Sequence, residues 1–356
     1  MLEKIIHGIE KFYIRITVWI LFLKKEKVYG KKGLKFSKLF YLAKGFYSDH
    51  PVPYDFKNNK YSDYISDIET IKLAYLNHPY GRLLRNKLIF SNYFRSYFTT
   101  PECYCIINKG IFEPVNSKIS IDSLAVLTEF TQKKQLILKP LLGTGGSGII
   151  LLESGSNSDL YLNKQPIDHN ELQKLIVSLD NYLVTEFIQQ GRFTAQFFPD
   201  TANTIRITTM CDPEKVSSFI PYSFMRFGRQ RTIPADNISL GGLFSMIDLN
   251  TGELTEAFEV VKNQKVKFHS SHPDTNAKIQ GTVIPGWINL RDVFIGIGSI
   301  IKPFIKIVGW DIILTDNSFA VIEANNGPDL YMQAVSYPFA KNPAAGKFLK
   351  EYHIRK

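Results

Sequence analysis

The chain contains few cysteines for its 356 residues, which limits the class of protein it can be. Its three cysteines, Cys103, Cys105 and Cys211, are too few for the disulfide framework of a small secreted domain. Cys103 and Cys105 lie two residues apart without a second pair, so a zinc site built from two cysteine pairs is excluded. We therefore expect a protein of the reducing cytoplasm.

The sequence also lacks long apolar runs, repeats and low-complexity stretches. Val18–Leu23, the uninterrupted apolar run of the N-terminal segment, is far shorter than the roughly 20 residues that a membrane-spanning helix needs. We find no signal peptide with a cleavage-like end and no internal repeat. The 44% hydrophobic and 21% charged fractions are those of a globular protein, and 356 residues suffice for two or three lobes.

Acidic residues are outnumbered, and the excess of basic residues is concentrated in one segment. Residues 1–50 hold eleven lysines and arginines against four acidic residues, which is +7 of the net charge of +10. The rest of the chain is therefore close to neutral. No RNA- or DNA-binding motif accompanies the basic segment, so we expect no nucleic-acid partner.

The basic segment predicts an amphipathic helix over residues 3–23. Its apolar residues recur at helical spacing, namely Ile5, Ile6, Ile9, Phe12, Tyr13, Ile16, Trp19, Ile20 and Leu23. Two interpretations remain open for residues 1–44. The segment contacts an anionic membrane surface at the inner face of the cell membrane, where each lysine adds roughly 1 kcal/mol. Alternatively, the helix docks on the protein's own core and its lysines are solvated.

The stretch Trp310–Asp329 predicts a β-hairpin. Trp310–Leu314 and Phe319–Ala324 are apolar strands, and Thr315–Ser318 between them consists of turn-forming residues.

One face of this hairpin carries oxygen ligands. Side chains alternate along a strand, so Glu323 and Asn325 share a face, and a three-residue loop, Asp316–Ser318, places Asp311 opposite Glu323. Two buried carboxylates repel each other unless a cation neutralises them, and carboxylate and amide oxygens suit Mg²⁺. The hairpin therefore predicts a magnesium site. The alternative is an edge hairpin with solvated acids.

A glycine-rich loop predicts a phosphate clamp. Leu136–Pro140 is a strand that contains Lys139, Leu141–Gly148 is the loop, and Ile149–Glu153 is a second strand. Glycines allow backbone N–H groups to approach an anion closely. The loop is not a Walker loop, because Ile149 follows Gly148 where Lys-Ser/Thr would be needed, and its match to the dinucleotide fingerprint is weak, because a β-type run follows where that motif requires a helix. The alternative is a plain hairpin loop with Lys139 in solvent.

Other segments supply the flanking elements. We expect helices over Arg82–Phe98, Asp168–Tyr182 and Leu290–Val308, and strands over Leu183–Ile188 and Asn203–Thr209. Arg206 is a lone arginine within the last of these apolar strands, so it needs a partner, which is either a ligand anion or a structural ion pair.

The order of these motifs resembles the ATP-grasp superfamily, and more specifically the sugar-transfer-associated ATP-grasp proteins found with surface-polysaccharide genes. The resemblance covers roughly residues 85–350. The motifs that carry it are Lys87, Lys139 with Gly143–Gly148, Thr185–Ile188, Asn203–Thr209 (NTIRITT), Asp236-Asn237 followed by Gly241-Gly242, Gly309–Asp311 (GWD) and Ile322–Asn325 (IEAN).

The resemblance implies an α+β fold, in which two lobes with antiparallel sheets hold ATP between them, beside a basic and mainly helical N-terminal region. It implies a division into residues 1–84, 85–185 and 186–356. The ATP contacts that it implies are Lys87, Lys139, Gly143, Thr144, Gly145, Gly146 and Ser147 at the phosphates, and Thr185, Glu186, Phe187 and Ile188 at the adenine. The Mg²⁺ ligands that it implies are Asp311, Glu323 and Asn325. Relatives often carry an acidic residue at the position of Thr185, where it accepts the adenine amino group. In this sequence we expect Glu186 to take that role.

The resemblance also implies an ATP-dependent carboxylate–amine ligase that works through an acyl phosphate, with Arg206 and Lys139 as catalytic residues. Its substrate is a small molecule or glycan that supplies a carboxylate and an amine for surface polysaccharide or capsule synthesis. The expected substrate contacts are Asn203, Arg226, Asn237, Gly241 and Gly242. Two alternatives remain open, an ATP-dependent phosphotransferase acting on a sugar and a nucleotide-binding scaffold without turnover at the membrane.

Overall fold

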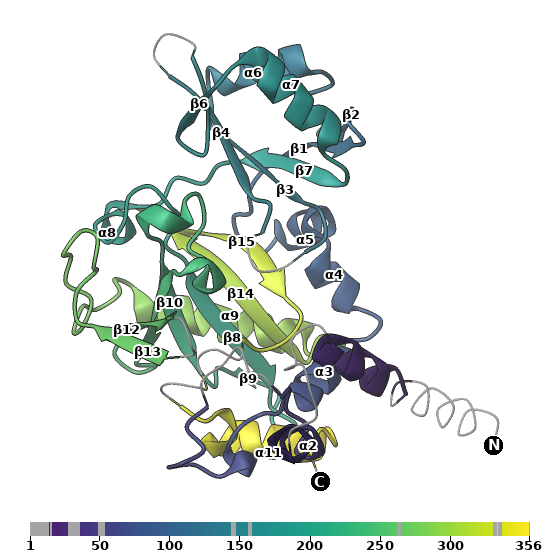
Figure 1. Ribbon diagram of the computed structural model, residues 1–356, viewed down its shortest axis with the longest axis vertical. Coiled ribbons are helices and arrows are strands. Elements are labelled where there is room, and N and C mark those ends of the chain that lie inside the picture. The colour runs from purple at the N-terminus through teal and green to yellow at the C-terminus, as the bar shows by residue number, and fades with distance from the viewer. Residues whose placement is uncertain are drawn as a thin grey trace.

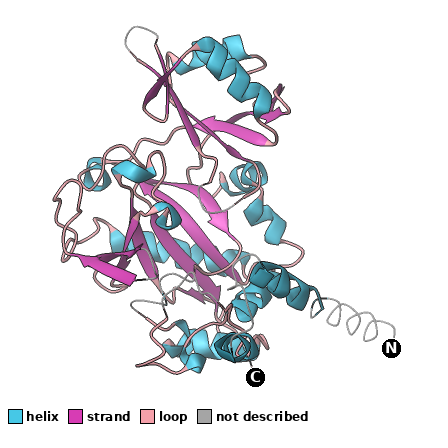
Figure 2. Ribbon diagram, in the orientation of Figure 1, coloured by secondary structure: helices cyan, strands magenta, loops and turns pink. Residues whose placement is uncertain are grey.

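The computed structural model describes residues 14, 16–27, 36–48, 54–143, 147–155, 159–261, 265–329, 333 and 337–355. Two antiparallel sheets with covering helices form an upper, smaller lobe and a lower, larger lobe in Figure 1. The helices and strands are shown by type in Figure 2. The predicted α+β fold with two antiparallel lobes and a helical N-terminal region is therefore confirmed.

The small lobe is built on a sheet of seven strands in the described residues. In sheet order they are β2 (Ile111–Pro114), β1 (Cys103–Asn108), β7 (Tyr182–Glu186), β3 (Leu136–Pro140), β4 (Ile150–Ser154), β5 (Leu160–Leu162) and β6 (Gln165–Ile167). Helices α6 (Leu124–Thr131) and α7 (His169–Ser178) cover one face, where Leu127 and Leu172 pack against Leu136, Leu138 and Leu152. Strand β3 has the predicted bounds, so Lys139 lies near its end, next to the glycine-rich loop.

The large lobe is built on a sheet of eight strands in the described residues. In sheet order they are β13 (Lys265–His269), β12 (Leu254–Val261), β11 (Leu243–Ile247), β10 (Ser223–Phe227), β8 (Ile205–Cys211), β14 (Ile307–Leu314) and β15 (Phe319–Asn325), while β9 (Ser218–Phe219) pairs with β8. The three strands β10, β8 and β14 are central, and most of their residues are buried.

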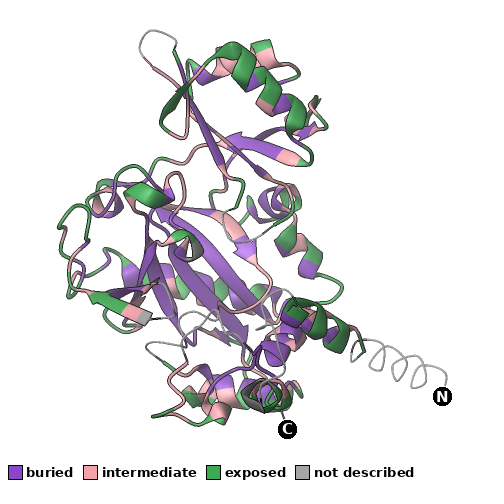
Figure 3. Ribbon diagram, in the orientation of Figure 1, coloured by how far each residue is buried: buried purple, intermediate pink, exposed green. Residues whose placement is uncertain are grey.

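Helices pack on both faces of the large sheet, and its inner strands are largely buried (Figure 3). On one face, α9 (Trp287–Ile301) packs through Phe294 against Trp310. On the other, α3 (Asp67–Tyr75) and α11 (Pro343–Glu351) pack against strand residues such as Phe224 and Phe258. The predicted helix Leu290–Val308 is wrong at its end, because residues from Ile307 onward belong to β14. A short apolar run suits a buried strand as well as a helix.

The helix predicted over Arg82–Phe98 is divided into α4 (Gly81–Arg85) and α5 (Lys87–Phe94). Asn86 between them has an extended backbone, and its side chain caps α5 by accepting from the N–H groups of Leu88 at 3.1 Å and Ile89 at 3.0 Å. This break makes Lys87 the first residue of α5. Phe90 and Phe94 then anchor α5 in the core of the large sheet.

The N-terminal helix is defined here by its described residues, 14 and 16–27; residues 3–13 and 15 of the predicted helix lie outside the described residues. One side of it docks on the protein, because Val18 and Phe22 pack against Tyr47 and Ile68. None of the described helices combines the length and apolarity that a transmembrane span requires. The remaining short helices are α2 (Phe36–Ala43), α8 (Arg192–Ala195), η1 (Tyr61–Asp63), η2 (Gln230–Thr232), η3 (Ile238–Leu240) and η5 (Phe339–Lys341).

Candidate active site

A cleft of about 1110 Å³ lies between the two lobes. Strands β3 and β7 of the small lobe line one part of it, and β8, β10, β14 and β15 of the large lobe line another. Lys139, Arg206, Arg226, Asp311 and Glu323 all border this cleft. Some of the residues that the sequence singled out for phosphate (Lys139), substrate (Arg226) and metal (Asp311 and Glu323) therefore meet in one place.

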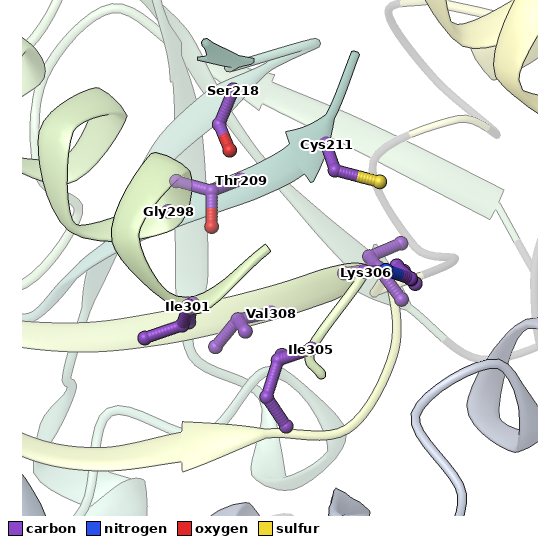
Figure 4. A pocket seen from close by; sticks show the side chains of 9 residues that line it. Thr209, Cys211, Ser218, Gly298, Ile301, Ile305, Lys306 and Val308 are labelled. Atoms are coloured by element: carbon purple, nitrogen blue, oxygen red, sulfur yellow. The ribbon is translucent and has the colours of Figure 1, made fainter. Parts of the chain in front are cut away.

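A second hollow lies between α9 and strands β8 and β9 (Figure 4). Gly298 permits the close packing there, because a Cβ at that position would lie 3.0 Å from the Ser218 side chain. The hollow is too narrow to hold a water molecule. We therefore assign it no binding role.

The acid-bearing hairpin has the predicted pairing but a different loop. Asp311 lies opposite Glu323 in the ladder of β14 and β15, as predicted. The predicted three-residue loop is wrong, because Leu314 pairs with Phe319 and leaves four residues between them. A β-bulge brings the two acids opposite each other despite the longer loop. The residue after Asp311 pairs with Val321, whereas Asp311 pairs with Glu323, so Ile322 is an extra residue on β15. The two carboxylates are thus brought together by the bulge rather than by the turn.

Two arginines from neighbouring strands hold Asp311. Arg206 of β8 lies opposite Asp311 and makes a bidentate pair with it, in which Nε donates to Oδ1 and Nη2 donates to Oδ2 at 2.9 Å. Arg226 of β10 places its Nη2 3.1 Å from Oδ2. Burial alone would raise the pKa of Asp311, but the charges of the two arginines hold that pKa below its ordinary value. The ion-pair interpretation of Arg206 is therefore confirmed.

Glu323 is the more easily protonated acid of the pair. Burial and the negative charge of Asp311 raise its pKa, and Lys87, whose Nζ lies 3.8 Å from Glu323 Oε2, opposes this rise. Asn325 Nδ2 donates to Asp311 Oδ2 at 3.2 Å and to Glu323 Oε1 at 3.3 Å. A positively polarised group thus already lies between the two carboxylates.

These three side chains fit a magnesium ion. A cation beside Asp311 and Glu323 would remove the repulsion that raises the pKa of Glu323. Throughout the described ranges, no three His, Cys, Asp or Glu side chains converge to form a metal site, so the set consists of two carboxylates and one amide. Such a set suits Mg²⁺, which takes one or two carboxylates and completes its shell with phosphate oxygens and water.

Lys139 is a buried cation that borders the cleft. Its side chain is 7% exposed, and among the described residues no acceptor bonds its ammonium group. Burial lowers the pKa of Lys139, and the nearby charge of Glu323 restores it only in part. An anion bound beside Lys139 would therefore stabilise its charged form. The interpretation of Lys139 as a solvated lysine is wrong.

Lys87 links the glycine-rich loop to the acids. Its Nζ donates to the Gly143 carbonyl at 3.0 Å and approaches Glu323, and its side chain is buried. Gly143 has a φ of 146° and Gly148 a φ of 77°, which are conformations that favour glycine. Ser147 of the loop is exposed, and Thr144, Gly145 and Gly146 lie outside the described residues.

The four residues predicted to meet adenine, Thr185, Glu186, Phe187 and Ile188, all line the cleft. Two of their backbone donors are already engaged within the sheet. Glu186 N–H donates to the Glu102 carbonyl at 2.8 Å, and Phe187 N–H donates to the Gln135 carbonyl at 3.2 Å. The Glu186 carboxylate lies 3.6 Å from Lys134 Nζ. Any adenine contact must therefore use other groups of this segment.

Of the five predicted substrate contacts, Arg226 and Asn237 border the cleft. Asn203 does not, and we correct that prediction: it is fully buried, and its Nδ2 donates to Gln190 Oε1 at 3.0 Å and to the Phe198 carbonyl at 2.7 Å. A substrate contact would break these bonds. Asn203 is therefore structural.

Gly241 and Gly242 do not line the cleft either, so their predicted contact with substrate is likewise corrected. The Gly241 carbonyl accepts from Arg231 Nη2 at 2.8 Å, and Gly242 N–H donates to the Asn237 carbonyl at 2.9 Å. A Cβ on Gly242 would lie 2.7 Å from the Asp236 carbonyl. Both glycines close the loop that brings Asp236 and Asn237 to the cleft.

Among the cleft residues that were not predicted as site residues are two acids and two arginines. Asp329 lies 3.7 Å from Arg206 Nη1, and Asp236 accepts from the Thr204 N–H at 2.8 Å and lies 3.6 Å from Arg226. Arg82 and Arg85 of α4 also line the cleft. Asp329 and Asp236 stand within stretches that the sequence had already singled out. The two arginines carry no such signal, because they look like ordinary surface residues of a helix.

Comparison with known proteins agrees with this geometry. The family model for sugar-transfer associated ATP-grasp proteins matches residues 72–342, which is most of the chain. A search of curated proteins gave no match.

Several solved structures match this chain at low identity and with TM-scores below 0.4. The ATP-grasp ligase PsnB complexed with minimal precursor is 9% identical, with a TM-score of 0.39 over 78% of this chain and 63% of that chain. The L-amino acid ligase from Bacillus licheniformis is 10% identical, with a TM-score of 0.38 over 77% and 52%. The D-alanine–D-alanine ligase from Bacillus anthracis is 13% identical, with a TM-score of 0.37 over 94% and 91%. The chain spans between half and two thirds of the length of the first structures it matches.

Proposed function

The chain belongs to the sugar-transfer associated ATP-grasp family, and we propose that it is an ATP-dependent carboxylate–amine ligase that works through an acyl phosphate. One observation carries the proposal. A buried lysine with no partner among the described residues, Lys139, and a pair of mutually repelling acids, Asp311 and Glu323, border the same cleft. The lysine favours a bound anion and the two acids favour a bound cation. Mg-ATP supplies both.

ATP and Mg²⁺ are the cofactors of this family and of this chain. We assign the phosphates to Lys87, Lys139 and the glycine-rich loop, and the adenine to the segment Thr185–Ile188. We assign the metal to Asp311, Glu323 and Asn325. When bound there, Mg²⁺ neutralises charge that develops on the phosphates during transfer.

The first half of the reaction activates a carboxylate, which is otherwise inert to amines at neutral pH. An oxygen of the substrate carboxylate attacks the γ-phosphorus, the bond to the β,γ-bridging oxygen breaks, and ADP leaves with that electron pair. Lys139 and Lys87 stabilise the charge on the transferred group. Arg206 keeps Nε and Nη2 on Asp311, and we assign the carboxylate or the acyl phosphate to its Nη1, which lies 3.7 Å from Asp329.

The second half forms the amide. The amine attacks the acyl carbon, inorganic phosphate leaves with the electron pair of the C–O bond, and the nitrogen loses a proton. Holding the two reactants together supplies much of the rate. Arg226 and Asn237, which border the cleft beside the acids, are our candidates for positioning the substrate.

The family description supports a substrate that contains a sugar. We propose an amide between an amino acid and a sugar or sugar acid, formed in the cytoplasm during surface polysaccharide or capsule synthesis. The acceptor is a small molecule or a glycan that supplies the carboxylate or the amine.

We further propose that the N-terminal helix holds the enzyme at the inner, anionic face of the cell membrane. Its docked side leaves Ile16, Trp19, Ile20 and Leu23 exposed at helical spacing. Lys24 and Lys27 are exposed beside this stripe. An apolar stripe flanked by lysines suits the interface of an anionic bilayer.

The proposed chemistry is tested by the dependence of ADP formation on two substrates. The protein is incubated with Mg-ATP and a panel of sugar acids and amino acids, singly and in pairs, and the products are identified by mass spectrometry. A ligase forms ADP in equal amount with an amide, and only when acid and amine are both present. A phosphorylated product from one hydroxyl compound would establish a phosphotransferase instead, and ATP binding without ADP formation on any pair would establish a scaffold.

A further inference from the structure

The cleft continues well beyond the acids. Its volume of about 1110 Å³ exceeds the roughly 300–1,000 Å³ of an ordinary ligand pocket. The additional part runs along α3, where Asp67, Thr70 and Ala74 line it, to the N-terminal helix, where Leu21 and Lys25 line it. We call this part the α3 groove. It offers room for a substrate that extends away from the reaction centre.

Two arginines mark the beginning of the α3 groove. Arg82 and Arg85 stand three residues apart on α4, and both are exposed and line the cleft. Within the part of the chain that the structure describes, neither has a carboxylate partner or a side-chain hydrogen bond. In contrast, Arg206 and Arg226 are both engaged by Asp311.

Both arginines lie beside the reaction centre. Helix α4 packs against β15, the strand that carries Glu323. Gly81 permits the close approach, because a Cβ there would lie 2.7 Å from Asn326 Nδ2. The chain then reaches Lys87, which approaches Glu323. Arg82 and Arg85 therefore line the same cleft as the acids and the α3 groove, from a helix that packs on the strand carrying Glu323.

The charges of the site leave these arginines available to a second anion. Lys87 and Lys139 serve the phosphates of ATP in the proposed function, and Asp311 occupies Arg206 and Arg226. A guanidinium presents a planar set of donors that matches the oxygens of a phosphate, and two of them on one helix can share a diphosphate.

We propose that Arg82 and Arg85 form an anion subsite that binds a phosphate or diphosphate group of the substrate. The substrate is then a sugar joined to phosphate, with its reacting group at the acids and the remainder of the molecule in the α3 groove. This inference rests on the proposed function, because it names the substrate class of the same site. The phosphate comes either from a soluble sugar phosphate or from a lipid-linked sugar.

The test uses the full chain with its ATP site filled. Inorganic pyrophosphate is titrated calorimetrically into protein saturated with Mg²⁺ and the non-hydrolysable analogue AMP-PNP, so that it cannot occupy the ATP site. We expect saturable binding that weakens about tenfold or more in Arg82→Ala and in Arg85→Ala, because each loses a charge-assisted hydrogen bond. Arg95→Ala is the matched control, since Arg95 is also exposed but does not line the cleft.

Glucuronic acid and glucuronic acid 1-phosphate separate phosphate recognition from carboxylate recognition. The two arginine variants should lose affinity for the 1-phosphate and keep their affinity for the free acid; equal losses would mean that the arginines bind the carboxylate and would overturn the proposal. Farnesyl diphosphate tests the source. Tighter binding than pyrophosphate supports a lipid-linked substrate, and equal binding supports a soluble one.

The same titrations separate this inference from the proposed function. AMP-PNP binding by each variant shows that it is folded and that its ATP site is intact. If AMP-PNP binds and pyrophosphate does not, the anion subsite is wrong and the ligase proposal stands. If AMP-PNP itself does not bind to the wild-type protein, the proposed function fails first.

Discussion

Arg206 and Asp311 form a buried bidentate ion pair across strands β8 and β14, with both side chains almost inaccessible to solvent. The pair holds Asp311 ionised in the interior and sets the direction of its oxygens. Removing one member of a buried pair leaves the other charge uncompensated, which is costly.

The first prediction follows from that pair. Arg206→Met should lower the free energy of unfolding by about 3 kcal/mol or more, although Arg226 remains near Asp311 and limits the loss. Chemical denaturation measures the change. Arg192→Met is the control, because the Arg192–Asp316 pair is exposed and should contribute less than about 1 kcal/mol. Equal small losses in the two variants would show that the buried pair contributes little to stability.

The second prediction concerns Lys139. Lys139→Met should abolish ATP binding without lowering stability, since the substitution removes a buried charge that has no partner among the described residues. Calorimetric titration with ATP and a denaturation curve give the two quantities. Lys133→Met, at an exposed position paired only with Glu129, should bind ATP as the wild type does. A destabilised Lys139→Met protein would mean that the lysine has a structural role instead.

The third prediction concerns the metal ligands. Glu323→Gln removes a carboxylate whose pKa is raised by burial and by Asp311, so the fold should tolerate it. Mg-ATP at 100 times its Kd should stabilise the wild type by roughly 2.7 kcal/mol. In the variant, the Mg²⁺-dependent part of that stabilisation should disappear, while the part seen with ATP and EDTA should remain. A melting temperature measured with and without Mg²⁺ decides this, and an unchanged Mg²⁺ effect would remove Glu323 from the metal site.

The fourth prediction is a pH dependence. Burial lowers the pKa of Lys139, so in the free protein this group loses its proton at a lower pH than an exposed lysine does. A phosphate favours the charged form and raises the pKa again on binding. ATP binding at alkaline pH should therefore take up a proton, and the affinity should fall as the pH rises through the lowered pKa. Titration in two buffers of different ionisation enthalpy measures the uptake, which should vanish in Lys139→Met.

The sequence predicted correctly those features that depend on residues close together in the chain. An assumed three-residue loop predicted that Asp311 and Glu323 would meet, and the strand that carries Lys139 was predicted with its observed bounds. The route to the first result was wrong, because a β-bulge at Ile322 rather than the turn sets the register. Bulges have no strong sequence signal.

The sequence did not predict which residues far apart in the chain would contact each other. Arg206 had two equally supported partners, and the structural one comes from a strand 105 residues away. Asn203 belongs to a motif, yet its amide serves three neighbouring chain segments rather than a substrate. Both outcomes depend on which strands lie side by side, and composition and periodicity do not determine this.

The fifth prediction tests the membrane proposal. The N-terminal helix buries Val18 and Phe22 while Trp19 and Leu23 remain 52% and 56% exposed, so the two sides can be changed separately. Trp19→Glu combined with Leu23→Glu should leave the fold intact, because both side chains are more than half exposed. The double variant should lose binding to phosphatidylglycerol vesicles in a sedimentation assay, since it removes apolar area and adds negative charge at an anionic surface.

Val177→Glu, which changes an exposed apolar residue on α7 of the small lobe, should bind vesicles as the wild type does. Wild-type binding should also weaken as salt is raised, because screening reduces the attraction of the lysines. Vesicle binding that survives the double substitution would place the membrane contact elsewhere or leave the helix with docking as its single role.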